Sequence, residues 1–441
     1  MLLIKNGIIV DPASDKNEHG EGMYKSDILI NEGRIIKIAP SMELSDASAF
    51  AKGEIKLIDA SGLKIGPGLV DVHVHFRDPG LTYKEDIETG AKAAAAGGYT
   101  SVVMMANTKP AVDSIETLEY VLEKAKKAPV NVYACGSVTK GLSGKELTDM
   151  DALYEKGAVG FTDDGIPIMD EELVKKAMEK AAFLNVPLSF HEEDPAYIKN
   201  PGINAGETAE KLGIGGADRM AEISLIKRDS RLALLTDVIY DCQHISTAEG
   251  VEIIRQARQE ALKTGKGRIH AEAAPHHFSL TQEAVEKYGS LAKMNPPLRT
   301  EADRMAVIAG IKDGTIDIIA TDHAPHSDEE KGRGLLEAPS GIIGLETAFS
   351  LAVTNLVRPG HLSLKKLFDR MSLSPAAMYH LPAGRIAEGM KADLVLFDEA
   401  REIVYNEFVS RSQNSPFKGQ KLYGKIEMTI CGGKIVYGFE R

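Results

Sequence analysis

Apolar positions follow two different periods along this chain, and the shorter period occupies both ends. Near the N-terminus, short apolar runs bounded by Gly, Asn and Asp occur at residues 2–10, 27–30, 34–38 and 55–59. Comparable runs near the C-terminus occur at residues 392–398, 425–430 and 433–438. Such runs are typical of β-strands joined by tight turns. We therefore predict that the two ends, residues 1–66 and 383–441, together form one small β-sandwich subdomain.

The middle of the chain, residues 67–382, alternates strand-like and helix-like segments. The apolar runs predicted as strands lie at about 69–75, 100–106, 130–135, 158–162, 186–191, 238–244, 268–273 and 316–321. The predicted helices lie at about 84–97, from 114 onward, and at about 143–156, 170–184, 208–226, 248–264 and 303–312. Eight strands separated by helices predict an α/β fold, and their number favours a closed (β/α)8 (TIM) barrel over an open sheet.

Net charge, apolar runs and cysteine spacing disfavour several classes of protein, such as nucleic-acid-binding and membrane-spanning proteins. The formal net charge of −12 argues against a nucleic-acid-binding surface. The first residues lack the architecture of a signal peptide, and no apolar run approaches the roughly 20 residues that span a bilayer. The three cysteines are scattered and form no CxxC pair, which is typical of small buried side chains in a reducing compartment. We expect a cytoplasmic protein that binds neither nucleic acid nor a membrane.

The first strand of the middle region carries the sequence Asp-Val-His-Val-His over residues 71–75. Side chains alternate between the two faces of a strand, so Asp71, His73 and His75 share one face and the valines share the other. Two imidazoles on one face at a strand end can chelate a metal ion. Taken alone, the pair is equally consistent with two hydrogen-bonded histidines.

Further polar residues stand at the ends of the other predicted strands. In a (β/α)8 barrel the carboxyl ends of the strands meet at one face, where functional side chains gather. The additional candidates are Asp163 or Asp164, His191, His244 and Asp322. A single histidine at a strand end is more often a hydrogen-bonded core group than a ligand, and Asp163-Asp164-Gly165 alone is an ordinary turn, because Asp-Gly is a common turn pair. The segment around Asp322 is harder to explain in this way, because three ionisable groups in five residues after an apolar strand are costly without partners. Together with His73 and His75 they exceed the needs of one metal ion and fit two adjacent cations that share a bridging carboxylate.

Several longer motifs identify a family resemblance. They are HVHFRDPG at 73–80, ANTKP at 106–110, FTDDG at 161–165, HIS at 244–246, PHH at 275–277, MNPPLR at 294–299, ATDHAPH at 320–326 and GIIGLET at 341–347. With these motifs the whole chain resembles the amidohydrolase superfamily, and specifically the bacterial class I dihydroorotases. Many hydantoinase-like members of the superfamily bridge their two metals with a carboxylated lysine. This chain has no lysine beside the FTDDG motif, so it differs from them at that position.

The resemblance implies a metal centre with two zinc ions per subunit. It implies that one zinc is held by His73, His75 and Asp322, that the second is held by His191 and His244, and that Asp164 bridges them. Asp163 stays the alternative to Asp164 as the bridging residue.

The resemblance also implies roles around the metals. Asp322 acts as the catalytic base and then as the acid that protonates the leaving nitrogen. The residues implied in substrate binding are His75, Arg77, Asn107, Asn295, His326, Ser340 and Gly341. Arg77 can offer a planar, two-pronged contact to a carboxylate, whereas its alternative role is a surface salt bridge with Asp78 or Glu85.

The implied reaction is the reversible cyclisation of N-carbamoyl-L-aspartate to dihydroorotate in pyrimidine biosynthesis. One alternative is a hydantoinase or allantoinase, which the missing lysine and the presence of Arg77 disfavour. The other is a metal-free structural partner of aspartate carbamoyltransferase, which the presence of all six ligands disfavours. We expect a homo-oligomer that acts on a small molecule, and an association with the carbamoyltransferase is a further expectation. The charged, glycine-containing segment 327–340 is predicted either to close over the site or to be a plain solvated loop.

Overall fold

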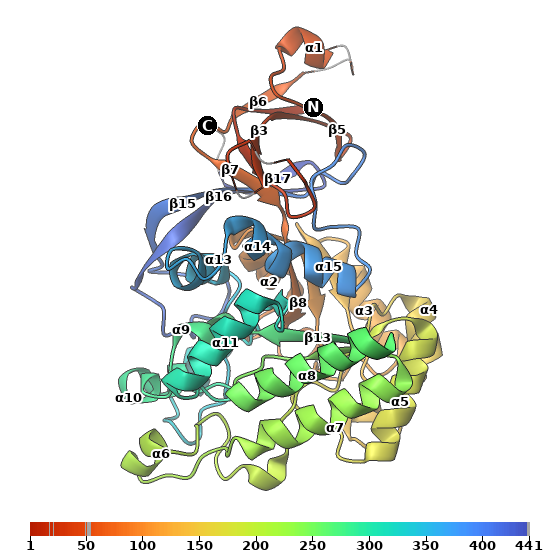
Figure 1. The fold of residues 1–441 in the computed structure, drawn as a ribbon, viewed down its shortest axis with the longest axis vertical. Helices are drawn as coiled ribbons and strands as arrows, with labels where there is room; N and C mark the ends of the chain where they lie inside the picture. The colour runs from red at the N-terminus through yellow and green to blue at the C-terminus, as the bar shows by residue number, and fades with distance from the viewer. Residues whose placement is uncertain (17, 21, 49, 51–53, 439–441) are drawn as a thin grey trace.

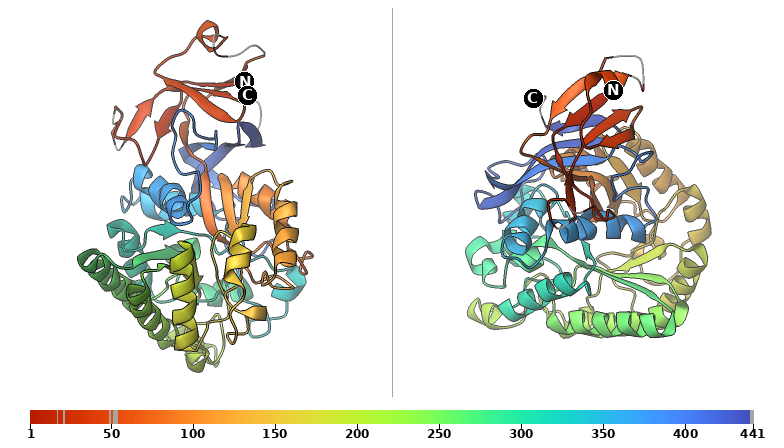
Figure 2. Two further views of the ribbon diagram at one scale, coloured as in Figure 1. Left: turned by 90° about the vertical axis from the view of Figure 1, so that its right-hand side faces the viewer. Right: turned by 45° about the horizontal axis from the view of Figure 1, so that its top comes forward.

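The computed structural model describes residues 1–16, 18–20, 22–48, 50 and 54–438 (Figure 1). The last three residues of the predicted C-terminal segment, 439–441, lie outside this description. Both termini lie in the upper part of the molecule in Figure 1, and the labelled helices other than α1 (Leu44–Ser48) gather below it (Figures 1 and 2). Among the described residues, no helix combines the length and the apolar character needed to cross a bilayer.

Two sheets contain the terminal strands. The first has the order β5–β4–β1–β6, with β1 at Leu2–Lys5, β4 at Asp27–Asn31, β5 at Arg34–Ala39 and β6 at Lys56–Asp59. The second has the order β17–β16–β15–β7–β2–β3, with β2 at Ile8–Val10, β3 at Met23–Lys25, β7 at Lys64–Pro67, β15 at Leu394–Val404, β16 at Lys421–Cys431 and β17 at Lys434–Gly438. Strand β7 pairs antiparallel with β15, from Leu394 opposite Pro67 to Phe397 opposite Lys64. The two ends of the chain therefore share one sheet.

The middle strands pair in parallel. They are β8 (Leu69–Val74), β9 (Tyr99–Met104), β10 (Asn131–Ala134), β11 (Pro187–Phe190), β12 (Ile239–Cys242), β13 (Arg268–Ala273) and β14 (Ile318–Ile319). Most of them (β8, β9, β11, β12 and β14) are buried on both faces. Parallel pairs join β8 to β9 to β10, and β11 to β12 to β13 to β14. Their apolar side chains suit strands covered by helices. The predicted alternation of strands and helices is thereby confirmed as an α/β fold.

Isolated bridges connect the two groups of parallel strands. Phe161 bridges in parallel to Gly136 on one side and to Leu188 on the other. Val74, at the end of β8, bridges in parallel to His323, which follows β14. The backbone N–H of His75 also donates to the carbonyl of His323 at 2.9 Å. The first and last of the parallel strands are thus neighbours near their carboxyl ends.

The connecting helices begin and end at recognisable residues. They are α2 (Ile87–Ala96), α3 (Ile115–Ala125), α4 (Met150–Lys156), α5 (Glu171–Leu184), α6 (Glu207–Lys211), α7 (Met220–Thr236), α8 (Ala248–Thr264) and α11 (Glu301–Asp313). Ser114 accepts from the N–H of Thr117 and caps α3, as predicted. Thr300 and Asp303 form a reciprocal capping box at the start of α11. Short helices α9 (Pro275–Ser279), α10 (Ala284–Tyr288), α12 (Asp328–Lys331), α13 (Ala348–Ala352), α14 (Leu364–Phe368) and α15 (Ser374–Met378) complete this region.

Four of the predicted elements, two strands and two helices, are wrong in their extent. The strand expected at 158–162 forms only the single-residue bridges at Phe161, and the strand expected at 316–321 is regular only over Ile318–Ile319. The helix expected at 208–226 is divided into α6 and α7, because three glycines between 213 and 216 disfavour helix. The helix expected at 143–156 begins only at Met150, after its cap Asp149.

Candidate metal centre

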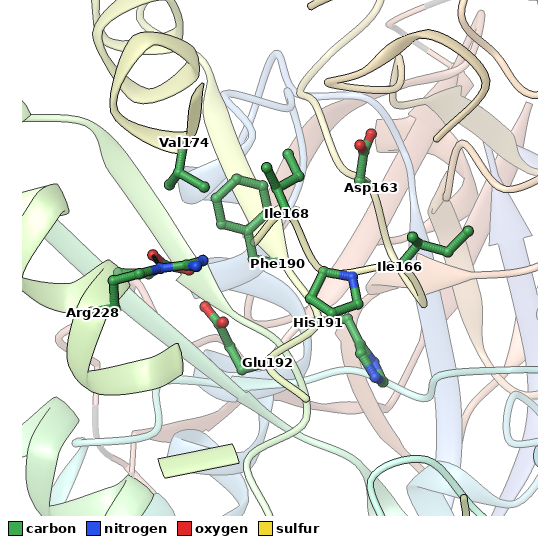
Figure 3. Close-up of a pocket in the computed structure, with 10 residues that line it drawn as sticks. Asp163, Ile166, Ile168, Val174, Phe190, His191, Glu192 and Arg228 are labelled. Atoms are coloured by element: carbon green, nitrogen blue, oxygen red, sulfur yellow. Dashed lines mark hydrogen bonds and ion pairs between the residues drawn. The ribbon is translucent and has the colours of Figure 1, made fainter. Parts of the chain in front are cut away.

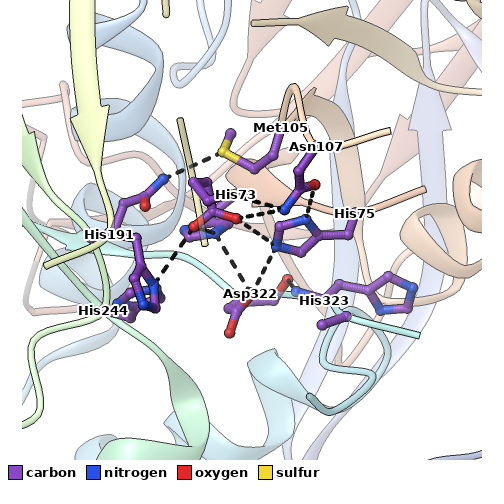
Figure 4. A network of polar contacts seen from close by, with 12 residues as sticks. His73, His75, Met105, Asn107, His191, His244, Asp322 and His323 are labelled. Carbon is purple, nitrogen blue, oxygen red and sulfur yellow. Dashed lines mark hydrogen bonds and ion pairs between the residues drawn. The ribbon is translucent and has the colours of Figure 1, made fainter. Parts of the chain in front are cut away.

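His73 is the buried centre of the polar cluster at the carboxyl ends of the parallel strands (Figure 4). Its Nδ1 lies 2.8 Å from Glu272 Oε2 on β13. Its Nε2 has no hydrogen-bond partner and lies 3.5 Å from Asp164 Oδ1 and 3.6 Å from Asp322 Oδ1. The contact with Glu272 fixes the ring so that Nε2 points into the cluster, as metal-ligating histidines require.

His75 joins the same cluster from the next position on its face of the strand. Its Nε2 lies 3.0 Å from Asp322 Oδ1 and 3.4 Å from Asp164 Oδ2. Its Nδ1 lies 2.9 Å from Asn107 Oδ1, whose amide nitrogen in turn lies 3.0 Å from Asp164 Oδ2. Asn107 therefore orients one histidine and one carboxylate at the same time.

The two neighbouring aspartates of the FTDDG motif face different surroundings. Asp163 accepts from the backbone N–H groups of Val138 and Thr139, at 2.8 and 3.0 Å, and from the Thr139 hydroxyl. Burial raises the pKa of Asp163 to about 6 in spite of these hydrogen bonds. Asp164 instead faces His73, His75 and His191. Of the two residues, Asp164 is the one that can bridge two cations.

His191 and His244 lie together on the opposite side of His73 from His75 (Figure 4). His191 Nδ1 is 3.0 Å from His244 Nε2 and 3.8 Å from Asp164 Oδ1. The other ring nitrogen of His191 lies 3.0 Å from Glu193 Oε2. Glu193 therefore orients His191 as Glu272 orients His73. His244 Nδ1 is buried without a partner, which leaves one further nitrogen of the cluster unsatisfied.

The cluster has the donors and the charge to hold metal ions. Two groups of three residues could each hold a metal ion, because the ligand atoms within each group all lie within 4.8 Å of one another. The first group is His73, His75 and Asp322, and the second is His73, Asp164 and His244. Burial would raise the pKa of Asp164, but the imidazoles of His73, His75 and His191 lower it well below its usual range. Burial would lower the pKa of His73, but Glu272 and Asp164 raise it well above its usual range. Two buried nitrogens, His73 Nε2 and His244 Nδ1, have no hydrogen-bond partner, and the charges around them favour a bound cation. The His and Asp donors of the cluster are ligands that suit zinc.

Three residues of the site have left-handed backbone conformations that side chains disfavour. The φ angles are +58° at Arg77, +30° at His244 and +49° at Asp322. Such conformations persist only where the surrounding structure holds them. Asp71 holds the segment before Asp322, because its carboxylate accepts from the N–H and the hydroxyl of Thr321 at 3.1 and 2.5 Å.

Glu222, on α7, holds the segment that follows His244. Its carboxylate accepts from the backbone N–H and the hydroxyl of both Ser246 and Thr247, with the Thr247 contacts at 2.9 and 2.7 Å. Arg299 from the MNPPLR motif also donates to the Ser246 hydroxyl at 3.1 Å. Glu222 is therefore a positioning residue for His244.

The substitution Glu222→Gln tests this positioning. An amide can accept at only one of its two atoms, so buried donors of Ser246 and Thr247 lose a partner. We expect metal affinity and kcat to fall about 10- to 100-fold, the usual effect of losing a group that orients a ligand. Metal content after gel filtration and turnover measure the effect, and Asp303→Asn, which also removes a buried acceptor in this region, is the control. Full metal content and full activity in Glu222→Gln would show that His244 needs no such support.

A cavity of about 210 Å³ opens beside the cluster. It is lined by His75, Arg77, Asn107, Asp164, Gly165, His191, His244, Asn295, Asp322, Ala324, His326, Ser340 and Gly341. The structure thus brings together all seven residues predicted to bind substrate. Every predicted metal ligand except His73 also lines this cavity, and His73 lies fully buried beneath it.

Arg77 faces this cavity with no carboxylate partner among the described residues. Its Nε donates to the carbonyl of Pro325 at 3.3 Å, and one terminal nitrogen lies 3.4 Å from His326 Nε2. Asp78 is bound instead by Tyr120 and Lys124, and Glu85 by Ser410 and Thr89. The alternative role of Arg77, a surface salt bridge with Asp78 or Glu85, is not found.

Gly341 lines the cavity beside Ala324 and His326. Its φ is +136°, and a Cβ at this position would lie 2.9 Å from the carbonyl oxygen of Ala324 and 3.0 Å from His326 Nε2. The backbone N–H of Gly341 donates to the carbonyl of Lys293 at 2.9 Å. This N–H group is therefore occupied, and Gly341 contributes space and shape to the cavity.

The segment 327–340 is anchored at several points. Ser327 caps the short helix α12, and Glu330 of that helix accepts from Tyr83 at 3.0 Å and pairs with Lys84 at 2.9 Å. Lys331 is 5% exposed. The segment is only partly in solvent, because Glu330 and Lys331 are buried whereas Asp328, Glu329 and Arg333 are exposed, and its closure over the site stays a prediction.

Sequence reasoning did not find the carboxylates that orient the ligands, Glu193, Glu222 and Glu272. The signal for Glu272 was a carboxylate between two alanines near the end of a predicted strand, which is costly to bury without a partner. A second cavity of about 10 Å³ lies behind His191, between Asp163, Ile168, Phe190 and Glu192 (Figure 3). It has room for no more than a water molecule and is no substrate site.

Comparison with known proteins identifies close sequence relatives. Residues 65–436 match the model of the Amidohydrolase family. The chain is 52% identical over 437 residues to a protein named Dihydroorotase from Clostridioides difficile, which covers 99% of this chain and 100% of the relative. It is 50% identical over 439 residues to a protein of the same name from Clostridium acetobutylicum, which covers 99% of each.

Solved structures with a similar fold are more distant in sequence. An L-hydantoinase (dihydropyrimidinase) from Arthrobacter aurescens superposes with a TM-score of 0.84 at 24% identity, over 100% of this chain and 96% of the other. A D-hydantoinase from Thermus sp. gives 0.82 at 23% identity, over 100% and 97%. These likenesses show a common fold.

Proposed function

This chain belongs to the amidohydrolase family, and we propose that it is a dihydroorotase, which interconverts N-carbamoyl-L-aspartate and dihydroorotate in pyrimidine biosynthesis. The observation that carries the proposal is the cavity itself. One wall holds the histidines and aspartates of the candidate metal centre, and another holds Arg77 without a carboxylate partner. This arrangement suits a cyclic amide that also bears a carboxylate.

The proposal includes a closed (β/α)8 barrel over residues 67–382 and a two-sheet β-sandwich formed by residues 1–66 and 383–441. The parallel pairs, together with the bridges at Phe161 and between Val74 and His323, support closure. One buried cluster with side chains from both terminal sheets, Ile4 and Ile30 from one and Ile65 and Leu396 from the other, supports the sandwich. A closed barrel places the candidate site where its strands end.

We further propose two zinc ions per subunit. His73, His75 and Asp322 would hold one, His191 and His244 would hold the other, and Asp164 would bridge them. Bound at this place, the ions would lower the pKa of a water molecule and polarise the amide carbonyl of the substrate. Glu272 and Glu193 keep the ring nitrogens of His73 and His191 pointed at the centre.

Asp322 moves the proton in this scheme. Its carboxylate lines the cavity, so it can take a proton from the attacking water and deliver it to the ring nitrogen as the amide bond breaks. The 3.0 Å contact of Asp322 Oδ1 with His75 Nε2 fixes the direction of the carboxylate. In the direction of cyclisation the same residue takes the proton from the ureido nitrogen.

The wall around His326 provides the positive charge that a substrate carboxylate needs. Burial and the neighbouring cations Arg77, Lys84 and Lys331 lower the pKa of His326 to about 2, so the ring is neutral at physiological pH. His326 can then contribute hydrogen bonds while Arg77 contributes the charge. Asn295, whose buried Oδ1 has no partner, supplies an additional acceptor at this wall.

Arg77→Met tests the carboxylate assignment. Removal of a charge-assisted hydrogen bond pair is expected to raise the KM for dihydroorotate about 10- to 100-fold. Steady-state kinetics with dihydroorotate, hydantoin and allantoin measure the effect, and Arg411→Met, outside the cavity, is the control. Turnover of hydantoin or allantoin by the unchanged protein, with none of dihydroorotate, would instead make the chain a hydantoinase or allantoinase.

We propose a cytoplasmic homo-oligomer that binds neither nucleic acid nor a membrane. An association with aspartate carbamoyltransferase is proposed as well, since the two enzymes would handle the same intermediate. Light scattering of the purified protein, alone and mixed with the carbamoyltransferase of the same organism, tests both assemblies.

A further inference from the structure

The segment 336–341 forms one side of the cavity and is held by two lysine side chains. Lys293 donates from Nζ to the carbonyls of Leu336 and Ala338, at 2.9 and 2.8 Å. Lys331 donates from Nζ to the carbonyls of Pro339 and Gly341, at 2.9 and 3.0 Å. The two ammonium groups thus reach four carbonyls in a stretch of six residues.

Both ammonium groups are removed from water without a carboxylate to balance them. Lys293 is 3% exposed and Lys331 is 5% exposed, and neither forms an ion pair with a described carboxylate. Burial and, to a smaller extent, the charge of Lys293 lower the pKa of Lys331 to about 7, although the neighbouring carboxylate of Glu330 acts in the opposite direction. A buried cation of this kind costs stability, which an apolar side chain of the same length would avoid. The arrangement therefore favours a role beyond stability.

Apart from the lysines, the segment is held only by scattered hydrogen bonds among the described residues. The N–H of Ala338 donates to the carbonyl of Gly334 at 2.9 Å, the N–H of Gly341 to that of Lys293 at 2.9 Å, and Asn414 Nδ2 to that of Gly341 at 3.1 Å. Residues 337–341 belong to neither a helix nor a strand, so no ladder of backbone hydrogen bonds fixes them. Two of them, Ser340 and Gly341, line the cavity, and the carbonyl of Ser340 lies 2.9 Å from His326 Nε2. If this stretch were loose, the substrate would have to order it on binding, and that cost would appear as a weaker affinity.

We propose that Lys293 and Lys331 are positioning residues that hold segment 336–341 as a preformed wall of the substrate site. The inference rests on the proposed function for the identity of the substrate. The two lysines touch neither the substrate nor the metal centre. They act through the backbone of Ser340 and Gly341, so they lower the KM and leave the chemical step unchanged.

The test uses Lys293→Met, Lys331→Met and the double variant in the full-length, zinc-supplemented protein. We expect the KM for dihydroorotate to rise about 10-fold or more in each single variant, with kcat within about threefold of the unchanged protein. Lys365→Met is the matched control, because Lys365 also donates to a backbone carbonyl, that of Ser14, far from the cavity. Lys293→Gln and Lys331→Gln, whose amides can still donate to a carbonyl, should give intermediate KM values and serve if the methionine variants fail to fold.

Limited trypsin digestion gives a readout that needs no activity. Arg333 is exposed in the same loop, and neither substitution removes this cleavage site. We expect cleavage after Arg333 to be about fivefold faster or more in both methionine variants and unchanged in Lys365→Met. Unchanged cleavage together with an unchanged KM, or a loss confined to kcat, would overturn the proposal. If the unchanged protein does not turn over dihydroorotate, the proposed function fails, while the digestion still decides whether the lysines hold the segment.

Discussion

Asp322→Asn is expected to lower kcat/KM for dihydroorotate by about 10³-fold or more. The substitution keeps the size of the side chain but removes the proton acceptor, and general acid–base groups contribute about 10²- to 10⁴-fold. It also weakens a ligand at the candidate metal centre. The measurement is steady-state hydrolysis at a fixed zinc concentration, with metal content determined on the same samples.

Asp317→Asn is the matched control for this result. Asp317 is a buried carboxylate just before β14, whereas Asp322 follows the same strand at its other end. Its partners are His270, at 2.8 Å, and Arg258, at 3.0 Å. We expect Asp317→Asn to lower stability and to retain most of the activity. If Asp322→Asn keeps more than about a tenth of the activity with full metal content, Asp322 is not the proton carrier.

Asp164→Asn is expected to remove both metal content and activity, whereas Asp163→Asn is expected to leave them. The neutral side chain at position 164 can no longer bridge two cations, and the loss of turnover should reach about 10²-fold or more. At position 163 the amide oxygen can still accept from the N–H groups of Val138 and Thr139. The expected cost there is about 1–2 kcal/mol in the free energy of unfolding.

Metal analysis and urea denaturation of the two single variants separate these roles. The pair is well matched because the residues are adjacent, identical in type and both buried. The reverse pattern, with metal lost only in Asp163→Asn, would show that Asp163 is the bridging residue and would contradict the geometry of the cluster.

The residues of the candidate metal centre could be predicted from the sequence because side chains alternate between the two faces of a strand. Alternation put His73 and His75 on one face, and the shared edge of parallel strands brought them toward Asp164, His244 and Asp322. The motif resemblance added the residues of the cavity wall. The family assignment made from these motifs is confirmed by the sequence comparisons.

The support around the site could not be predicted because it depends on contacts between distant segments. Glu272 and His73 are 199 residues apart in the sequence, and no local sequence pattern predicts that they are in contact. The left-handed conformation of His244 is unfavourable for the backbone. Glu222, on another element, stabilises it through hydrogen bonds to the residues that follow His244. Nothing in the local sequence distinguishes Lys293 and Lys331 from solvated lysines, and only the packed structure places them against the backbone of 336–341.

Turnover of dihydroorotate by metal-free protein, followed as zinc is added back in steps, tests the central claim most directly. We expect no turnover after chelation and a rise that ends at two zinc ions per subunit, with hydantoin and allantoin unreactive throughout. Full turnover by the metal-free protein would contradict the proposed centre. No turnover of dihydroorotate at any zinc content would contradict the proposed function.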